Sequence, residues 1–336
     1  MKEIISFKKK SWKAGVLPSK TAIFVIGDLH GEYILLDKML REINKEIKKL
    51  PKLVNKEIIF IGDYIDRGLN SKKTISVLIE LKKKYLQYKR INIHYICGNH
   101  DEFFSKIIFS KGIIKEPQDN RFFNIDPLYK LMRSSCNYVY ITGFKAWFNV
   151  GGGKTTVRDY CPEILHELES IINHINDDKQ EKYIKLNYLI NKLKESIPKT
   201  HKSFFKNIIN NYYLIIGEYL FIHAGVNPKK KLIYQGIGKN SKKLIEYEYI
   251  ELLMIRDPFL WIDKLNNCPL YVIHGHTPST QIKNNIIIAD CRKDYRLCLD
   301  TKVYNEQGSL TCFFKFKNNN KFISISKKNT DIKTIY

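Results

Sequence analysis

The chain has 336 residues, of which 44% are hydrophobic, and a formal net charge of +23. It is long enough to bury a full core, in one large domain or two smaller ones. No apolar run approaches the ~20 residues of a membrane helix, and the lysine-rich N-terminus lacks the apolar segment of a secretory signal. We therefore expect a cytoplasmic protein with no membrane insertion. Seven scattered cysteines without a Cys-x-x-Cys pair indicate reduced thiols.

The positive charge has two interpretations. A basic surface can attract nucleic acid, anionic lipid or a polyanionic substrate. The lysines, however, are dispersed through nearly every predicted helix, and the chain is rich in Lys, Ile and Asn but poor in Arg. This distribution favours codon bias with a modest attraction for anionic substrates. Nucleic acid remains compatible with the charge but is not favoured as a partner.

The first hundred residues alternate between strands and helices. Residues 1–20 read as a basic leader, and the apolar runs TAIFVIG, EIIFIG and NIHYICG then predict three strands. Helices are predicted between and after them, over 33–50, 71–89 and 102–110. Right-handed crossovers make such strands parallel and adjacent.

The rest of the chain has a different pattern. Residues 111–150 read as irregular and 162–212 as helical, so an insert over about 111–215 is expected as a cap beside the site. Strands LFIH and LYVIH follow, and then NNIIIAD, YRLCLDT, SLTCFFKF and KFISISK, which are typical of an antiparallel sheet. The prediction is an α/β sandwich of two mixed β-sheets flanked by helices, in a single domain over 21–336.

Short polar motifs follow five of the predicted strands: GDLHG at 27–31, GDYIDRG at 62–68, GNHD at 98–101, HAG at 223–225 and HGHTP at 274–278. The carboxyl ends of parallel strands meet at one edge of a sheet, so these residues are expected to converge. Oxygen and imidazole donors without thiolates suit two hard or borderline divalent metals. The sequence thus predicts a binuclear metallohydrolase site.

In order and spacing, these motifs resemble the phosphoprotein phosphatase family of calcineurin-like metallophosphoesterases, over about residues 21–316. FNVGGGKTTVRDY and MIRDPFLW resemble segments of the bacterial-type serine/threonine phosphatases and diadenosine tetraphosphatases. The resemblance implies the calcineurin-like sandwich with a helical cap insert. Two positions depart from the family pattern. Asp101 stands where many protein phosphatases have Glu and dinucleotide hydrolases commonly have Asp, and Lys302 replaces the Gly of an LDTG segment.

The resemblance implies two divalent ions, with Mn²⁺ favoured and Fe or Zn compatible. Six side chains are implied as ligands: Asp28 and His30 for the first ion, Asp63 as the bridge, and Asn99, His223 and His276 for the second ion. A bridging carboxylate offsets the repulsion between two close cations, and neutral Asn and His keep the ions Lewis acidic.

Four further residues receive catalytic roles from the resemblance. His100 is the implied general acid for the departing oxygen, and Asp66 is expected to hold it by a hydrogen bond. Arg67 and Arg256 are expected to bind phosphate oxygens through their planar guanidinium groups. Metal-bridging hydroxide would attack the phosphorus in line, so no Ser or Cys nucleophile is required.

Three functions compete. The first is hydrolysis of phosphoserine or phosphothreonine in proteins. The second is hydrolysis of dinucleoside polyphosphates such as diadenosine tetraphosphate or cap-like substrates, which Asp101 favours. The third is a nucleic-acid-binding or scaffold protein on a degenerate phosphatase fold, which the charge favours and the complete motif set opposes.

Other residues have open roles. Gly151-Gly152-Gly153-Lys154-Thr155 is expected to be a turn near the cap, because Phe148 occupies the first glycine position of a phosphate-binding loop. His274 can line the phosphate pocket or be structural. Tyr64 can contribute to the pocket floor or pack at the strand end, and His201 is expected to be structural.

Overall fold

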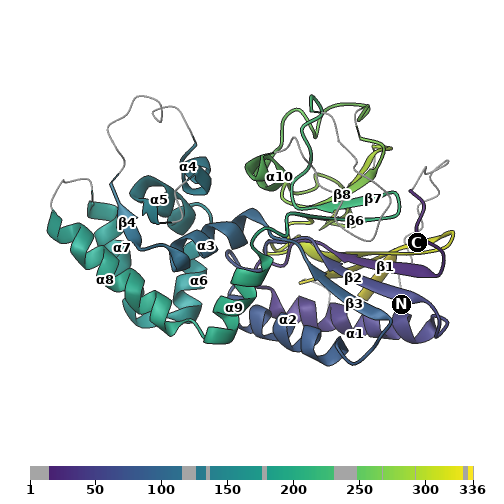
Figure 1. Ribbon diagram of the computed structural model, residues 1–336, viewed down its shortest axis with the longest axis horizontal. Coiled ribbons are helices and arrows are strands. Elements are labelled where there is room, and N and C mark those ends of the chain that lie inside the picture. Colours follow the sequence, from purple (N-terminus) through teal and green to yellow (C-terminus); the bar gives the residue numbers. More distant parts are fainter. Residues whose placement is uncertain are drawn as a thin grey trace.

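The computed structural model describes residues 15–115, 126–133, 137–175, 180–230, 248–266, 268–291, 293–327 and 332–335. Most of the predicted leader, residues 1–14, lies outside the described residues. None of the helices in the described ranges combines the length and apolar character that a membrane crossing requires. Figure 1 shows two layered sheets at one end of the molecule and a helical lobe at the other.

The larger sheet has six strands in the order β14-β13-β12-β1-β2-β3. Its strands are β1 (Thr21–Ile26), β2 (Asn55–Phe60), β3 (Ile91–Tyr95), β12 (Ser309–Phe316), β13 (Asn319–Ser326) and β14 (Ile332–Ile335). β1, β2 and β3 pair in parallel, as the crossover argument predicts. The three C-terminal strands join this sheet in antiparallel fashion through β12, beside β1.

The second sheet has four strands in the order β11-β8-β7-β6. Its strands are β6 (Tyr213–Ile216), β7 (Tyr219–Ile222), β8 (Tyr271–His274) and β11 (Arg296–Cys298). β7 and β8 are parallel, so their carboxyl ends point the same way. The described residues also contain two separate two-stranded sheets: β4 (Gly112–Ile114) with β5 (Tyr138–Tyr140), and β9 (Ile282–Lys283) with β10 (Ile286–Ile287).

The C-terminal strands do not form one antiparallel sheet, which corrects the sequence prediction. β12 and β13 pair as expected, but β11, from the YRLCLDT run, pairs in parallel with β8 in the other sheet. All three residues of β11 (Arg-Leu-Cys) are buried, so this short strand has no polar–apolar alternation that would reveal its partner. The tertiary structure decides that pairing.

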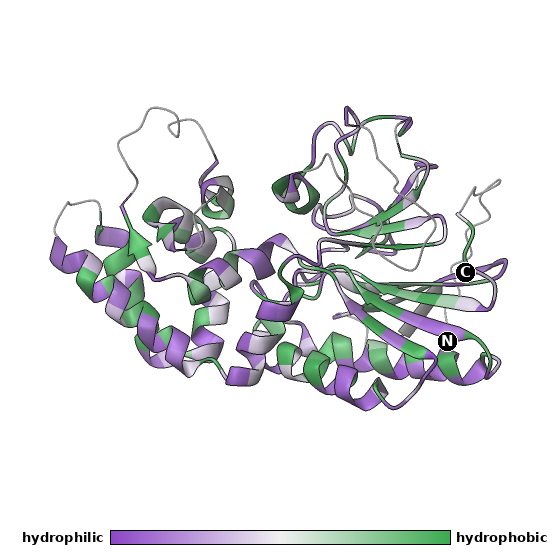
Figure 2. Ribbon diagram, in the orientation of Figure 1, coloured by the Kyte–Doolittle hydropathy of each residue, from purple (hydrophilic) through white to green (hydrophobic). Residues whose placement is uncertain are grey.

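The helices surround the sheets and build the lobe. They are α1 (Tyr33–Lys49), α2 (Ser71–Tyr85), α3 (Asn99–Phe109), α4 (Pro127–Arg133), α5 (Ile141–Asn149), α6 (Gly153–Tyr160), the 3-10 helix η2 (Pro162–Ile164), α7 (Leu165–His174), α8 (Gln180–Ser196), α9 (Lys199–Ile208) and α10 (Tyr249–Met254). α1 packs against β12 and β13, and α2 packs against β3. Both helices carry hydrophobic and hydrophilic residues on different sides (Figure 2), as expected for helices that cover one face of a sheet.

The insert is more ordered than predicted. Residues 111–150, read as irregular, contain β4, α4, β5 and α5 among the described residues. α5 has only nine residues and includes Gly143, which is unfavourable for a helix. Its stability comes from burial of Phe144, Trp147 and Phe148. The helices predicted between 162 and 212 form as η2 and α7 to α9.

Alternation along β1 explains the layers. Phe24 and Ile26 face the helices, whereas Ile23 and Val25 face the second sheet and pack in a cluster that includes Phe221. Successive strand residues point to opposite faces, so one buried strand supplies two cores. A third apolar cluster covers the outer face of the second sheet. The result is the predicted arrangement of two mixed sheets with helices outside.

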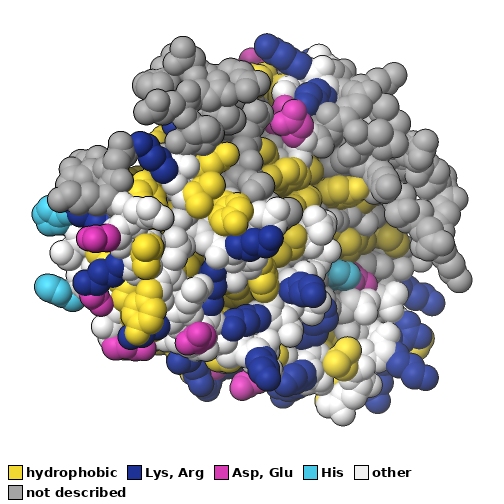
Figure 3. Space-filling view, turned by 60° about the vertical axis from the view of Figure 1, so that its left-hand side comes forward, with side chains coloured by type: hydrophobic (Ala, Val, Ile, Leu, Met, Phe, Trp, Pro, Cys, Tyr) yellow, Lys and Arg dark blue, Asp and Glu magenta, His cyan; other side chains and the backbone are white. Residues whose placement is uncertain are grey.

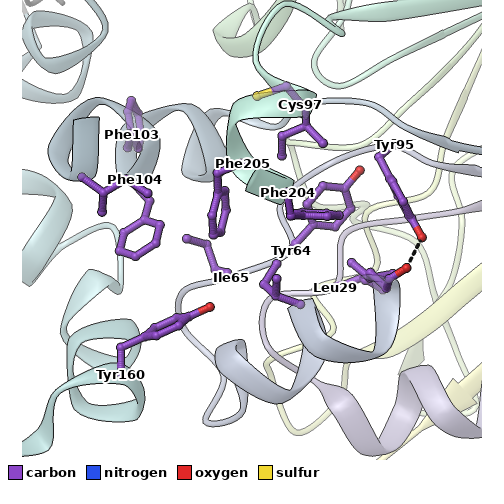
Figure 4. Close-up of a cluster of buried hydrophobic side chains, with 14 of the residues drawn as sticks. Leu29, Tyr64, Ile65, Tyr95, Cys97, Phe103, Phe104, Tyr160, Phe204 and Phe205 are labelled. Carbon is purple, nitrogen blue, oxygen red and sulfur yellow. Dashed lines mark hydrogen bonds between the residues drawn. The ribbon is translucent and has the colours of Figure 1, made fainter. Parts of the chain in front are cut away.

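An aromatic cluster joins the lobe to the sheets. The ring of Phe104 on α3 lies 5.8 Å from Tyr160 on α6 and 5.1 Å from Phe205 on α9, measured between centroids. These side chains are buried together (Figure 4). Aromatic pairs at such distances add to the stabilisation from buried area. The insert is therefore packed onto the helix that begins at the GNHD motif.

Basic side chains are spread over the visible face in Figure 3, where they alternate with acidic and apolar ones. Many lysines lie next to a carboxylate, such as Lys45 with Glu42 and Lys49 with Glu46. This spread agrees with the dispersed lysines of the sequence.

Candidate active site

The five polar motifs meet where the carboxyl ends of the two sheets adjoin. β1, β2 and β3 lead to Asp28, Asp63 and Asn99, and β7 and β8 lead to His223 and His276. All five side chains are buried. The predicted convergence therefore takes place, but across two sheets and not along the edge of one.

Several site residues have strained backbones. His30, Asp63, Asp66, Arg67 and His276 all have positive φ, between 41° and 70°. The left-handed conformation costs a residue with a Cβ about 1–2 kcal/mol. Tertiary contacts hold it: the backbone N–H of His30 donates to the Asp63 carbonyl at 2.8 Å. Concentrated strain of this kind is typical of functional sites.

Asp63 lies at the centre of the site, and its two carboxylate oxygens face different groups. Oδ2 is 3.5 Å from His30 Nε2 and 3.8 Å from His100 Nε2, whereas Oδ1 is 3.3 Å from His223 Nε2. Donor atoms of His30, Asp63 and His100 lie within 4.8 Å of one another, and so do those of Asp28, Asp63 and His223. Asp63 belongs to both groups, as a bridging carboxylate must.

Asn99 lies between the two imidazoles of the second sheet. Its Oδ1 is 2.8 Å from His223 Nε2 and 2.9 Å from His276 Nδ1. Backbone carbonyls lie 2.9 Å from Nδ1 of His223 and 3.0 Å from Nδ1 of His30. A carbonyl that accepts the Nδ1–H fixes the tautomer and leaves Nε2 free as a metal ligand.

His100 and Asp66 form a buried pair. His100 Nδ1 donates to Asp66 Oδ2 at 2.8 Å, and both side chains are almost fully buried. The other ring nitrogen, Nε2, points toward Asp63 and lies 3.2 Å from the Arg67 guanidinium. The predicted pairing of these two residues is present in the fold.

The two arginines reach the site from different sides. The Arg67 guanidinium lies 3.2 Å from Nε2 of His30 and stacks 4.6 Å above the ring of Tyr304. Arg256 is exposed, and its Nε donates to Thr277 Oγ1 at 3.3 Å. Thr277 directly follows His276, so Arg256 lies at the histidine end of the cluster. Burial lowers the pKa of His276, and His223 and Arg256 lower it further.

The electrostatics of the cluster favour a cation. Burial raises the pKa of Asp28 well above its usual range, and the carboxylates of Asp300 and Asp63 raise it further. Burial acts in the same direction on Asp63, but its histidine neighbours outweigh it and lower that pKa. Burial, with Arg67, also lowers the pKa of His30. Crowded carboxylates and imidazoles form a suitable donor set for metal ions.

The Asp101 carboxylate connects two of the motif loops by hydrogen bonds. It accepts hydrogen bonds from the backbone N–H groups of Asp63 (2.8 Å), Tyr64 (3.0 Å) and Gly98 (2.9 Å). The side chain is fully buried and ties the second motif loop to the third. Asp101 therefore gives no support to a dinucleotide over a phosphoprotein substrate.

Two of the residues with open roles are structural. His274 is buried, its Nε2 lies 3.2 Å from the Arg296 guanidinium, and its ring lies against Phe259. The Tyr64 hydroxyl donates to the Ile96 carbonyl at 2.6 Å. Both side chains stabilise the strand ends beneath the site.

The structure adds residues that the sequence did not indicate. Asp300 is buried near Asp28, and burial raises its pKa to about 6. Its Oδ1 accepts from the backbone N–H of Lys302, which adopts φ 55° where the family has glycine, so the turn forms. Trp147 and Thr156 of the insert donate to the Asp66 carboxylate. Thr156 lies in the FNVGGGKTTVRDY segment, whereas Trp147 directly precedes it and carried no sequence signal.

A buried cluster of acceptors beside two arginines has the chemistry of a metal-dependent phosphoesterase. Comparison with known families agrees, because the model of the Calcineurin-like phosphoesterase family matches residues 21–187, about half of the chain. The chain belongs to this family, as its motifs predicted.

Two curated relatives share short segments with it. Serine/threonine-protein phosphatase BSL2 of Arabidopsis thaliana is 37% identical over 86 residues, which are 26% of this chain and 8% of the relative. Serine/threonine-protein phosphatase PP2A-like PPG1 of Saccharomyces cerevisiae is 37% identical over 89 residues, 26% of this chain and 21% of the relative. The chain thus matches less than a quarter of either relative.

Among solved structures, a candidate diadenosine tetraphosphatase covers 97% of this chain and 98% of its own, with 13% identity and a TM-score of 0.47. A protein serine/threonine phosphatase from Saccharomyces cerevisiae with similarity to human phosphatase PP5 covers 94% and 79%, with 13% identity and a TM-score of 0.40. Likeness at this level carries no information on the substrate.

Proposed function

We propose that this protein is a binuclear metal phosphatase that hydrolyses phosphomonoesters, with phosphoserine and phosphothreonine in proteins as its substrates. The observation that carries the proposal is the position of Asp63, whose carboxylate belongs to two groups of ligand atoms. The two curated relatives named as serine/threonine-protein phosphatases support the choice of substrate.

The donor set fits metal ions. Among the described residues, the buried atoms Asp28 Oδ1 and His276 Nε2 have no hydrogen-bond partner. A buried polar atom without a partner is costly unless a ligand completes it. The proposed ligands are those expected from the motifs: Asp28, His30, Asp63, Asn99, His223 and His276. Two divalent ions, for which we propose Mn²⁺, would supply Lewis acidity and a water of lowered pKa for in-line displacement.

In this proposal His100 is the general acid. Its Nδ1–H is held by Asp66, so Nε2 is the atom that delivers a proton to the departing alkoxide oxygen. The buried carboxylate, 2.8 Å from Nδ1, fixes the orientation of the ring, so Nε2 faces the site. General acid catalysis matters most for an alkyl leaving group such as serine or threonine, because the alkoxide is a strong base.

Arg67 and Arg256 would bind the phosphate oxygens. Each guanidinium presents parallel N–H groups that match two phosphate oxygens. Arg67 is held in its plane by the ring of Tyr304, and Arg256 by Thr277. Fixed positive charge on both sides of the phosphate stabilises the charge that develops in the transition state.

We further propose that residues 21–336 form one catalytic domain and that the insert over about 111–215 acts as a cap that influences substrate choice. The contacts of Trp147 and Thr156 with Asp66 support a role for the insert in the site.

The test compares two substrates on the Mn²⁺-loaded protein. We expect kcat/KM on a phosphothreonine peptide to exceed that on diadenosine tetraphosphate. A large preference for the dinucleotide, with nucleotide products, would instead establish the dinucleoside polyphosphate hydrolase. Absence of metal-dependent turnover on both, together with salt-sensitive RNA or DNA binding, would favour the scaffold function.

A further inference from the structure

The insert completes the surroundings of Asp66. Trp147 on α5 donates its Nε1–H to Asp66 Oδ2 at 2.8 Å, and Thr156 on α6 donates its hydroxyl to Asp66 Oδ1 at 2.5 Å. Trp147, Thr156 and Asp66 are all fully buried. Neither Trp147 nor Thr156 belongs to the strand-end motifs. The carboxylate that holds His100 is therefore itself held by two side chains of the insert, one on each oxygen.

The hydrogen bonds leave Asp66 little freedom. Oδ2 receives both the Trp147 N–H and the His100 Nδ1–H, while Oδ1 receives the Thr156 hydroxyl. The backbone N–H of Asp66 lies 3.1 Å from Thr156 Oγ1, which accepts it, and 3.2 Å from Ser71 Oγ. Thr156 thus acts as donor and acceptor to the same residue. Both oxygens of Asp66 are fixed, and with them the plane of the His100 ring.

The same segment also holds Arg67. The Gly152 carbonyl accepts the backbone N–H of Arg67 at 3.2 Å. Gly152 has φ 87°, and a Cβ there would lie 2.7 Å from Arg67 Cγ and 2.8 Å from its backbone nitrogen. Only glycine permits this approach. The glycine-rich run expected as a turn near the cap therefore packs directly on the loop of the second motif.

Trp147 is itself held in place. Its ring lies 6.0 Å from Phe104 on α3 and 5.7 Å from Phe144 on its own helix, between centroids. Gly153 allows a close approach, since a Cβ there would lie 2.3 Å from the indole. A packed indole with one rotamer presents its N–H in a constant direction.

We propose that Trp147 and Thr156 are positioning residues that orient the general acid His100 through Asp66. This inference rests on the proposed phosphatase function. The hydrogen bonds to Asp66 fix the orientation of its carboxylate. Because His100 Nδ1 donates to this carboxylate, its orientation also sets where His100 Nε2 lies relative to the departing oxygen. Hydrogen-bond partners that orient metal ligands are commonly worth 10–100-fold in activity, and we expect an effect of the same size for the partners of a general acid. The insert thereby belongs to the catalytic apparatus, beyond any role in substrate choice.

The main test is Trp147→Phe, which keeps a packed aromatic ring and removes the N–H donor. We expect kcat on a phosphothreonine peptide to fall about 10–100-fold with KM little changed. On p-nitrophenyl phosphate, whose leaving group needs little protonation, the loss should be several-fold smaller. Trp261→Phe is the matched control, because Trp261 is 72% exposed and lies outside the insert; its rates should stay close to the wild type.

A second pair of variants separates orientation from folding. Thr156→Val removes the hydroxyl at nearly constant volume and should lower kcat on the peptide, whereas Thr156→Ser keeps the hydroxyl and should restore most of it. If Trp147→Phe fails to fold, this pair carries the test. An equal loss with Val and Ser would overturn the positioning role of Thr156.

A double-mutant cycle tests the route through His100. In a His100→Asn background, Trp147→Phe should cause no further loss of kcat, because the group that it orients is gone. A further loss of the same size as in the wild type would overturn the inference. If wild type and Trp261→Phe hydrolyse no phosphate ester at all, the proposed function itself fails. If they are active and Trp147→Phe matches them on both substrates, only the positioning role fails.

Discussion

The two sheets contribute to the site unequally. Most site residues come from the segments that follow β1, β2 and β3, namely Asp28, His30, Asp63, Asp66, Arg67, Asn99 and His100. The second sheet supplies His223 after β7, His276 after β8 and Asp300 after β11. Parallel strands joined by right-handed crossovers bring the strand–helix connections to one edge, where charged and reactive groups lie next to one another. The second sheet then completes the ligand set. The complete ligand set therefore forms only when the two sheets pack against each other.

The largest expected effect is at the residue shared by both ligand groups. Asp63→Asn removes a charge and weakens an oxygen donor, so metal content and phosphatase activity should both fall to background. His223→Gln, in the second sheet, should lose part of the metal, because the ligands proposed for the other ion, Asp28, His30 and Asp63, remain. Elemental analysis after dialysis and turnover assays check both variants. Asp37→Asn, on the outside of α1, serves as the control.

Full metal content and activity in Asp63→Asn would contradict the bridging role. Equal metal loss in His223→Gln and Asp63→Asn would show that the two sheets contribute equally to metal binding.

The next effect is catalytic. His100→Asn should keep the metal content of the wild type and lose about 10²–10⁴-fold in kcat on a phosphothreonine peptide, the usual contribution of a general acid. The comparison of metal content with rate is the decisive measurement. Unchanged turnover of an alkyl phosphate would show that another group donates the proton.

A third prediction concerns His201, which connects two helices of the insert to α2. His201 on α9 is buried and contacts the Tyr160 hydroxyl at 2.8 Å and Ser76 Oγ at 3.1 Å. Burial, with a smaller contribution from Lys72, lowers the pKa of His201 to about 4. The unfolded chain has a histidine of ordinary pKa, near 6.5, and so binds more protons between pH 6.5 and 4. Stability should therefore fall as the pH is lowered through this range.

Thermal unfolding between pH 7 and 4 measures this effect. His201→Gln removes the titrating group, so its Tm should fall less than that of the wild type over the same range, by a few degrees. The matched control is His94→Gln, at a half-buried histidine paired with Glu57. Parallel curves for His201→Gln and wild type would exclude His201 as the source.

The smallest effect is expected at the turn that follows Asp300. Lys302 has φ 55°, which glycine adopts without strain. Lys302→Gly should raise the free energy of unfolding by up to about 1 kcal/mol, with activity unchanged. Chemical denaturation measures the difference, with Lys283→Gly on β9 as a control that should gain nothing. A loss of stability in Lys302→Gly would show that the lysine side chain itself stabilises the turn.

Much of the fold was predictable where local pattern and tertiary environment agree. The helix predicted over 33–50 runs from Tyr33 to Lys49, and the strand runs ending at GD, GD and GN become β1, β2 and β3. These segments have strong apolar periodicity and are bounded by glycine. α5 was not predicted, because Gly143 and a run of aromatics give no clear period in nine residues. Its helix depends on the burial of those aromatics.

The sequence by itself determined the motif set, and with it the family, the parallel strand–helix repeats and the predicted site residues. Strand ends and left-handed turns tolerate few residue types, so they leave short motifs that can be recognised in the sequence. Tertiary structure alone decided that two sheets share the site, that β11 pairs with β8, that Asp101 braces backbone N–H groups, and that Trp147 and Thr156 reach Asp66. Apart from the bond between Asp101 and Gly98, the side-chain contacts named here join residues that are 37 to 90 positions apart in the chain. Packing between distant elements leaves no local periodicity, so only the folded chain reveals it.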